Sequence, residues 1–78
     1  MNPWLHRAVE HLAPRIGRVT ASNAVTLAVR KMAIATDAVR REDLPDIARN
    51  VSTILRVFLG SEAAAQLEEE IAGLEVEE

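Results

Sequence analysis

The chain contains no cysteine and no tyrosine, and its only aromatic residues are Trp4 and Phe58. Without cysteine it can form neither a disulfide nor a zinc site with thiolate ligands. A chain of 78 residues builds a small core, and domains of this size usually add a disulfide, a metal or a partner. We therefore expect the core to be completed by close helix packing or by association with another chain.

Long apolar runs are missing as well. Although 49% of the residues are hydrophobic, no stretch approaches the ~18 apolar residues that indicate a membrane-spanning helix. The first seven residues do not follow the basic-then-apolar order of a signal peptide. We therefore expect a cytoplasmic protein that has no membrane segment.

Glycine and proline are scarce, with three of each, and they stand where helices should start, bend or stop. The apolar residues are mostly Ala, Val, Leu and Ile, of which Ala and Leu are strong helix formers. No segment shows the period-2 apolar pattern of a strand. The sequence predicts an all-α fold, either a small four-helix bundle or two packed helical hairpins. We expect a single helical domain over residues 1–74 and a frayed acidic tail over residues 75–78.

Asn2 and Pro3 mark the start of the first helix, as an N-cap followed by proline at the first helical position. Apolar residues then recur at helical spacing. Pro14 lacks an N–H group and would clash with a carbonyl one turn earlier, so we expect this helix to end or kink near residues 12–13. Gly17 should close the segment.

A second helix is expected to begin near residues 20–22 and to run to about residue 35. It is apolar around most of its circumference, which is typical of a helix buried on more than one side. A narrow polar stripe separates two apolar flanks, and one flank should stay partly exposed in a monomer. The candidate partner-binding residues on these flanks are Val25, Leu27, Val29, Met32 and Ile34.

Two further helices are expected in the second half of the chain. Asp43 is the expected N-cap of the third helix, and Gly60 is its expected C-terminal stop. Leu55 and Phe58 lie on the apolar stripe of this helix, so we predict that both are core residues. Ser61 can cap the fourth helix at once, which predicts a tight turn between antiparallel neighbours.

The two halves of the chain carry opposite charge. Residues 1–41 hold seven basic and two acidic residues, a net charge of +5, whereas residues 42–78 hold two basic and ten acidic residues, a net charge of −8. The halves could attract each other within one chain or between two copies, or the basic half could bind nucleic acid. Pairing of the halves needs no further partner, and we favour it.

No catalytic constellation is evident. His6 and Glu10 share a helix face, but His11 lies about 140° away around a helix with 3.6 residues per turn. Two ligands do not make a metal site. The consecutive glutamates at residues 68–70 point in different directions, as on a solvated face. We expect no enzymatic activity, no cofactor and no metal.

These observations favour a non-enzymatic protein-interaction or regulatory module that acts through homo- or hetero-oligomeric helix packing, most simply as a homodimer. The alternative is a helix-turn-helix-like DNA-binding protein whose second helix reads the bases. The acidic pI of about 5.3 and the long expected turn over residues 17–22 argue against this alternative. Its candidate nucleic-acid-binding residues are Arg18, Asn23, Thr26, Arg30 and Lys31.

Overall fold

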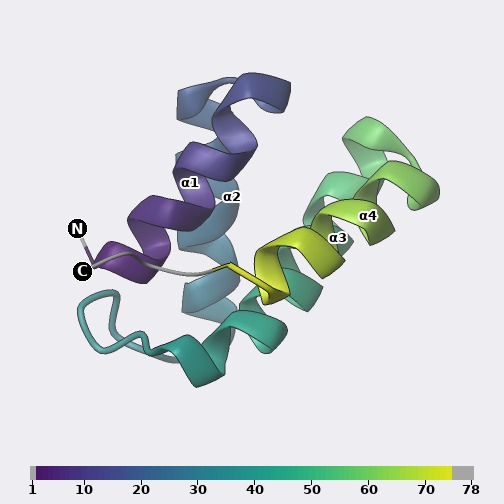
Figure 1. Cartoon of the computed structure of the whole chain (residues 1–78). Coiled ribbons are helices and arrows are strands. Elements are labelled where there is room, and N and C mark those ends of the chain that lie inside the picture. The colour runs from purple at the N-terminus through teal and green to yellow at the C-terminus, as the bar shows by residue number, and fades with distance from the viewer. Residues whose placement is uncertain (1, 75–78) are drawn as a thin grey trace.

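The computed structural model describes residues 2–74, and over this range it is helical without strands. Helices α1 (Pro3–Ile16) and α2 (Arg18–Lys31) form one hairpin, and α3 (Leu44–Leu59) and α4 (Ser61–Ala72) form a second one (Figure 1). A 3-10 turn, η1 (Arg41–Asp43), precedes α3. The predicted all-α fold, a small four-helix bundle or two packed helical hairpins, is confirmed. The predicted acidic tail, residues 75–78, lies outside the described residues.

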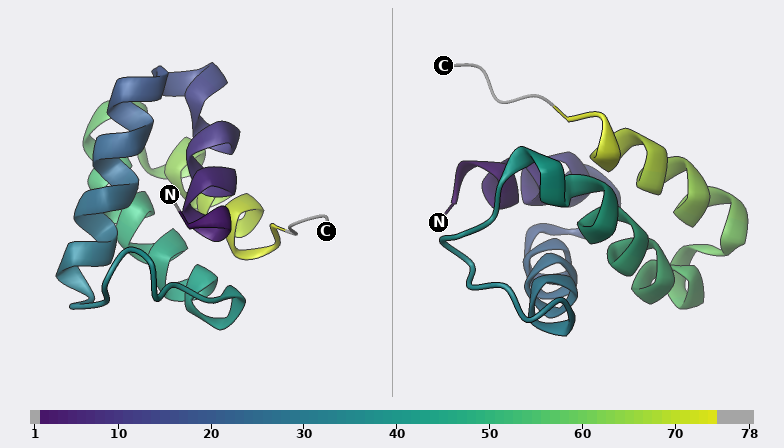
Figure 2. Two further views of the ribbon diagram at one scale, coloured as in Figure 1. Left: turned by 90° about the vertical axis from the view of Figure 1, so that its left-hand side faces the viewer. Right: turned by 90° about the horizontal axis from the view of Figure 1, so that it is seen from below.

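The hairpins pack with α1 and α4 in one layer and with α2 and α3 in the other (Figure 2). A single hydrophobic core joins all four helices. The accessible surface is 4835 Å², close to the ~4700 Å² expected for a folded monomer of 8.6 kDa. The chain therefore closes its own core, and its small size does not by itself require a partner.

The start of α1 agrees with the sequence analysis. The side chain of Asn2 accepts a hydrogen bond from the backbone N–H of Trp4 at 2.9 Å, and Pro3 is the first helical residue. The same Asn2 side chain donates to the backbone carbonyl of Val39 at 2.9 Å. This bond ties the beginning of α1 to the segment that precedes α3.

Of the predicted end or kink of α1 near residues 12–13, the end is wrong, because the helix continues through Pro14 to Ile16. Pro14 stands in the last turn, where its missing N–H removes one hydrogen bond. The next bonds are still made, since the N–H of Gly17 donates to the carbonyl of Ala13 at 2.8 Å. A proline this close to a helix end does not stop the helix early.

The predicted bounds of α2 are also wrong. The helix begins at Arg18, directly after Gly17, and ends at Lys31 rather than near residue 35. The carbonyl of Gly17 accepts the first helical hydrogen bond, from Ala21 at 2.9 Å, so no polar side chain is needed to cap the helix. Ala33 has a φ of 57°. This left-handed conformation is incompatible with a right-handed helix, so α2 cannot extend through Ala33.

Each hairpin turns on one glycine. Gly17 has φ 87° and ψ 151°, and Gly60 has φ 85° and ψ 165°, a region that is essentially restricted to glycine. Gly60 ends α3 as predicted, but Ser61 is the first residue of α4 and not its cap. We call these glycines the two corners. The turn between α1 and α2 and the turn between α3 and α4 lie at the tips of two diverging arms (Figure 1).

Helix α2 buries one face only, contrary to the expectation that it is buried on more than one side. The residues on this face are Ala21, Ala24, Val25, Ala28 and Val29. Their spacing places them on one stripe of a 3.6-residue helix. Three of them are alanines, which allow neighbouring helices to approach closely. Of the two apolar flanks, the structure buries the one with Val25 and Val29 and exposes Leu27.

Helix α3 confirms one predicted core residue and corrects another. Leu55 is fully buried, but Phe58 exposes 69% of its surface. The two hairpins spread apart towards their corners (Figure 1), so no neighbouring helix covers Phe58 near Gly60. Asp43 precedes α3 as expected, but its carboxylate accepts a bond from the N–H of Arg40 at 2.9 Å and does not cap α3.

Candidate protein-interaction face

The exposed large apolar side chains of residues 2–74 all lie on α2 and α3. They are Val19 and Leu27 on α2, exposed by 74% and 45%, and Val57 and Phe58 on α3, exposed by 86% and 69%. These two helices form one layer of the fold (Figure 2). We call these four residues the α2–α3 face.

A groove of about 240 Å³ runs between the same two helices. We call it the α2–α3 groove. The fully buried Leu55 contributes to its lining, and the exposed Leu27 and Phe58 stand on its opposite walls. Its lining residues are Thr20, Asn23, Ala24 and Leu27 from α2, and Ile54, Leu55 and Phe58 from α3. The groove is thus mainly apolar, with a hydroxyl and an amide supplied by α2.

Three exposed charged side chains stand at the end of α2 and at the start of α4. Arg30 and Lys31 are exposed in the last turn of α2, and Glu62 is exposed in the first turn of α4, beside the Gly60 corner. Within residues 2–74 none of these three side chains forms an ion pair. Because α2 runs away from the corners, its two cations lie at the end opposite to Glu62.

The predicted partner-binding residues occupy three different environments in the structure. Val25 and Val29 belong to the core of the chain itself and have no surface left for a partner. Met32 and Ile34 are half-buried beyond the end of α2, where they pack against that core. Leu27 alone lines the α2–α3 groove.

Sequence reasoning missed Val19 and Phe58 as parts of the face. Phe58 shares the helical stripe of Leu55, and periodicity does not reveal how far a covering helix extends. Val57 did carry a signal, because it lies off the main apolar stripe of α3, on the same side of the helix as the exposed Asp46. A single valine off the stripe is nevertheless common on protein surfaces.

The candidate nucleic-acid-binding residues also differ in their environments. Asn23, Arg30 and Lys31 are exposed on α2, whereas Thr26 is half-buried beside α1. Arg18 is held by the carboxylate of Glu10, with Nη1 and Nη2 at 2.5 and 3.1 Å from its two oxygens.

The hydrogen bond from Arg18 lowers the pKa of Glu10 below its ordinary value.

A single residue, Gly17, connects α1 to α2. This connection is shorter than the 3–4-residue turn of a helix-turn-helix. The long turn expected over residues 17–22 is therefore wrong.

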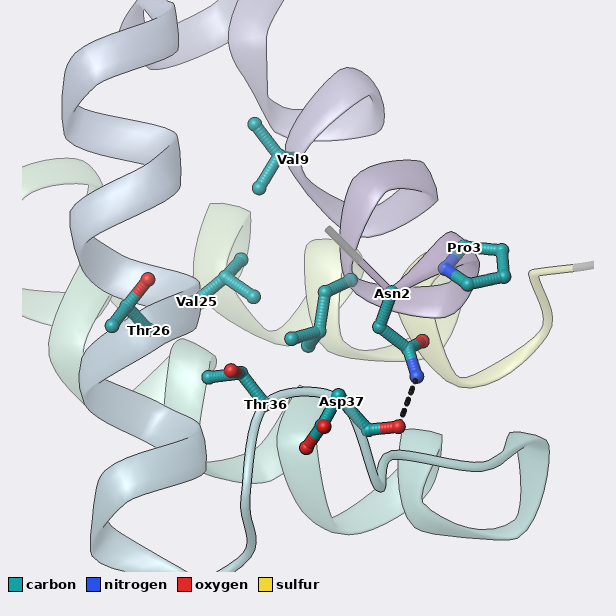
Figure 3. A pocket seen from close by; sticks show the side chains of 8 residues that line it. Asn2, Pro3, Val9, Val25, Thr26, Thr36 and Asp37 are labelled. Atoms are coloured by element: carbon teal, nitrogen blue, oxygen red, sulfur yellow. Dashed lines mark hydrogen bonds between the residues drawn. The ribbon is translucent and has the colours of Figure 1, made fainter.

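A second hollow, of about 570 Å³, lies between the start of α1, α2 and the segment that follows α2 (Figure 3). Its lining combines apolar side chains with two threonine hydroxyls and a carboxylate. The amide of Asn2 donates to the backbone carbonyl of Asp37 at 3.4 Å and closes one edge. The lining residues are Asn2, Pro3, Leu5, Val9, Val25, Thr26, Thr36 and Asp37.

The two histidines make separate contacts with carboxylates. No group of three or more potential ligands from His, Cys, Asp and Glu occurs within residues 2–74. His6 lies 3.7 Å from the carboxylate of Glu10. His11 joins α1 to α4 instead, with Nε2 at 2.6 Å from Oε1 of Glu70, and Arg15 adds a 3.8 Å contact to the same carboxylate.

The His11–Glu70 contact predicts a specific pH dependence. The hydrogen bond from His11 lowers the pKa of Glu70 below its ordinary value, so the folded state favours the ionised carboxylate. The resulting stabilisation is present above the ordinary glutamate pKa and is lost as pH falls through the lower pKa of the folded state. Between neutral pH and about pH 3, the urea midpoint of the wild type should therefore fall further than that of Glu70→Gln.

Glu69→Gln is the matched control, since Glu69 is exposed one residue away and forms no ion pair within residues 2–74. It should lose stability on acidification as the wild type does. Equal losses in the wild type and Glu70→Gln would contradict a stabilising role of this contact.

No helix within residues 2–74 is long and apolar enough to cross a lipid bilayer. Comparison of the chain with protein-family models, with curated proteins and with solved structures finds no match.

Proposed function

We propose that this chain is a non-enzymatic protein-interaction module whose α2–α3 face packs against a helix of another polypeptide, either a second copy or a different chain. One observation carries the proposal. Leu27 and Phe58 expose apolar surface on opposite walls of the same groove. The cytoplasmic location expected from the sequence is part of the same proposal.

The arrangement of the exposed side chains supports this function more than their number does. Single exposed apolar residues are normal on a protein surface, whereas contiguous patches mark interaction sites. Full burial of a leucine or phenylalanine side chain is worth about 1.5–3 kcal/mol. An aromatic side chain beside a groove is also a typical anchor of a protein interface. Two helices with a groove between them suit an amphipathic helix as the partner.

DNA binding is the second candidate, and it is favoured by Arg30 and Lys31, which are exposed and form no ion pair within residues 2–74. Arg18 is engaged by Glu10, and the exposed Leu27 and Val19 lie on the same helix as the two cations. Such apolar side chains suit a protein partner better than a phosphate backbone. A salt-sensitive complex with duplex DNA that is weakened by Arg30→Ala would replace our proposal with this candidate.

The test uses the whole chain as bait, with host proteins and a differently tagged copy of the chain offered together. Any retained protein is identified, purified and titrated against the wild type and three variants. Leu27→Asp and Phe58→Asp place a charge on each wall of the groove and should each weaken binding at least about tenfold, because an unpaired charge is costly in a buried contact. Ala65→Asp, at an exposed position of α4, should bind as the wild type does.

Binding that is equal in all four proteins would show that the α2–α3 face is not the site. Retention of neither a host protein nor the tagged copy would contradict an interaction function altogether. Circular dichroism of each variant checks that the helices remain folded.

A further inference from the structure

Within residues 2–74, the hollow beside the start of α1 shares no lining residue with the α2–α3 groove. Its volume of about 570 Å³ lies within the ~300–1,000 Å³ range of small-molecule pockets. Its apolar lining comes from side chains that the fold itself buries, Leu5 and Val9 on α1 and Val25 on α2. The apolar part of the hollow is therefore built from the core of the protein.

Two hydrogen bonds hold the segment after α2 against the start of α1. The side-chain amide of Asn2 donates to the backbone carbonyls of Asp37 and Val39, at 3.4 and 2.9 Å, and Figure 3 shows the first of these bonds. Val39 is itself buried in the hydrophobic core. Thr36 and Asp37 are thus anchored beside the hollow before a ligand arrives, and such preorganisation lowers the cost of binding.

Three polar side chains that line the hollow have no hydrogen-bond or ion-pair partner within residues 2–74. They are the hydroxyls of Thr26 and Thr36 and the carboxylate of Asp37. Thr53 on α3 shows the usual alternative for a helical threonine, because its hydroxyl donates to the backbone carbonyl one turn earlier at 3.0 Å. Thr26 also stands in a helix, but its hydroxyl makes no such bond and stays available to a ligand.

The charge of the hollow is negative. Among the residues 2–74 that line it, Asp37 is the only charged one. Arg40, the basic residue nearest to Asp37 in the chain, is paired with Glu42 at 3.3 Å. An ammonium group has three hydrogen-bond donors and no acceptor, whereas carboxylate and hydroxyl oxygens accept. The polar groups of the hollow therefore match an ammonium group.

We propose that this hollow binds a small organic cation, a primary ammonium group carried by a compact apolar body. The ammonium group donates to the carboxylate of Asp37 and to the neighbouring threonine hydroxyls, and the apolar body packs on the buried apolar lining. A free amine and the lysine side chain of another protein share this chemistry. The site is separate from the α2–α3 face and does not depend on it.

An NMR titration of the isotope-labelled full chain tests the site with three probes. Phenethylamine carries the ammonium group, phenethyl alcohol replaces it with a hydroxyl, and a capped lysine amide presents it as a protein side chain does. The amide signals of Thr36 and Asp37 should shift in a saturable way. The dissociation constant for phenethylamine should be about threefold lower than that for phenethyl alcohol, the effect of an exposed ion pair.

The third probe distinguishes the two sources of the ammonium group. Tighter binding of phenethylamine than of the lysine amide supports a free amine as the ligand, and the reverse order supports a protein side chain. Both orders support the ammonium site itself.

Two substitutions separate the charge of the site from its shape. Asp37→Asn removes the charge and keeps the size of the side chain, so the preference for phenethylamine over phenethyl alcohol should disappear. Thr26→Leu adds bulk inside the hollow and should abolish the saturable shifts of both probes. Thr53→Leu, at an exposed position of α3, is the matched control and should bind as the wild type does. The remaining amide signals show whether each variant is folded.

The absence of saturable shifts with every probe would overturn the site, as would unchanged binding by Thr26→Leu. Equal affinity of the wild type for phenethylamine and phenethyl alcohol, or a preference that persists in Asp37→Asn, would overturn the assignment of a cation. None of these results bears on the α2–α3 face, so failure of this site is distinguishable from failure of the proposed function.

Discussion

Leu55→Ala is expected to lower the free energy of unfolding by about 2–5 kcal/mol, as is usual when a buried leucine is truncated. Leu55 is fully buried in the C-terminal half of α3 and belongs to the hydrophobic core. Phe58→Ala, one turn further along the same stripe, should cost less than about 1 kcal/mol. The difference arises because most of the Phe58 surface is already in contact with water in the folded monomer.

Urea unfolding followed by circular dichroism measures both effects. The measurement should be made in a Leu27→Asp background, so that any loss of dimer contacts does not add to the cost of Phe58→Ala. Similar destabilisation by the two substitutions would show that Phe58 is covered within the monomer. In that case the α2–α3 face would lose its main aromatic anchor.

Gly60→Ala is expected to destabilise the fold by about 1–3 kcal/mol, the usual cost of a residue held in a sparsely populated region of φ and ψ. A Cβ atom at Gly60 would meet no other atom within 4 Å, so the cost comes from the backbone alone. The positive φ of Gly60 is needed because this residue alone reverses the chain between α3 and α4.

Gly73→Ala provides the matched control. Gly73 has a φ of −97°, and an added Cβ would lie 3.6 Å from the carbonyl oxygen of Glu69, an ordinary contact. Alanine should therefore be tolerated there, with a change within about 1 kcal/mol in either direction. Thermal melting compares the two variants. Equal melting temperatures would mean that the Gly60 corner relaxes into a conformation that alanine can adopt.

The α2–α3 face carries apolar side chains that a monomer does not need. They are not used by the core, since Leu55 and the buried stripe of α2 fill the junction between the hairpins without them. A partner chain packed on this face would bury them.

Local signals in the sequence predicted the helical class and several helix boundaries. Asn2 caps α1, and Gly60 ends α3, because capping and positive φ involve only the neighbouring turn of the chain. The same local rules failed at Pro14, where α1 continues to Ile16, and at the start of α2, which lies at Arg18 and not near residues 20–22. A proline in a last turn costs little, and a glycine corner makes a separate cap unnecessary.

Helical periodicity also predicted the core stripes of α1 and α3, including Leu55. Only the tertiary structure decided which flank of α2 is buried, because both flanks are apolar and the choice depends on where α1 and α3 pack against it. Only the tertiary structure decided the exposure of Phe58 as well. Periodicity assigns Phe58 to the apolar stripe of α3, and the divergence of the hairpins leaves that part of the stripe uncovered. Propensity and capping act within about one helical turn, whereas the groove forms between α2 and α3, whose facing residues are dozens of positions apart in the chain.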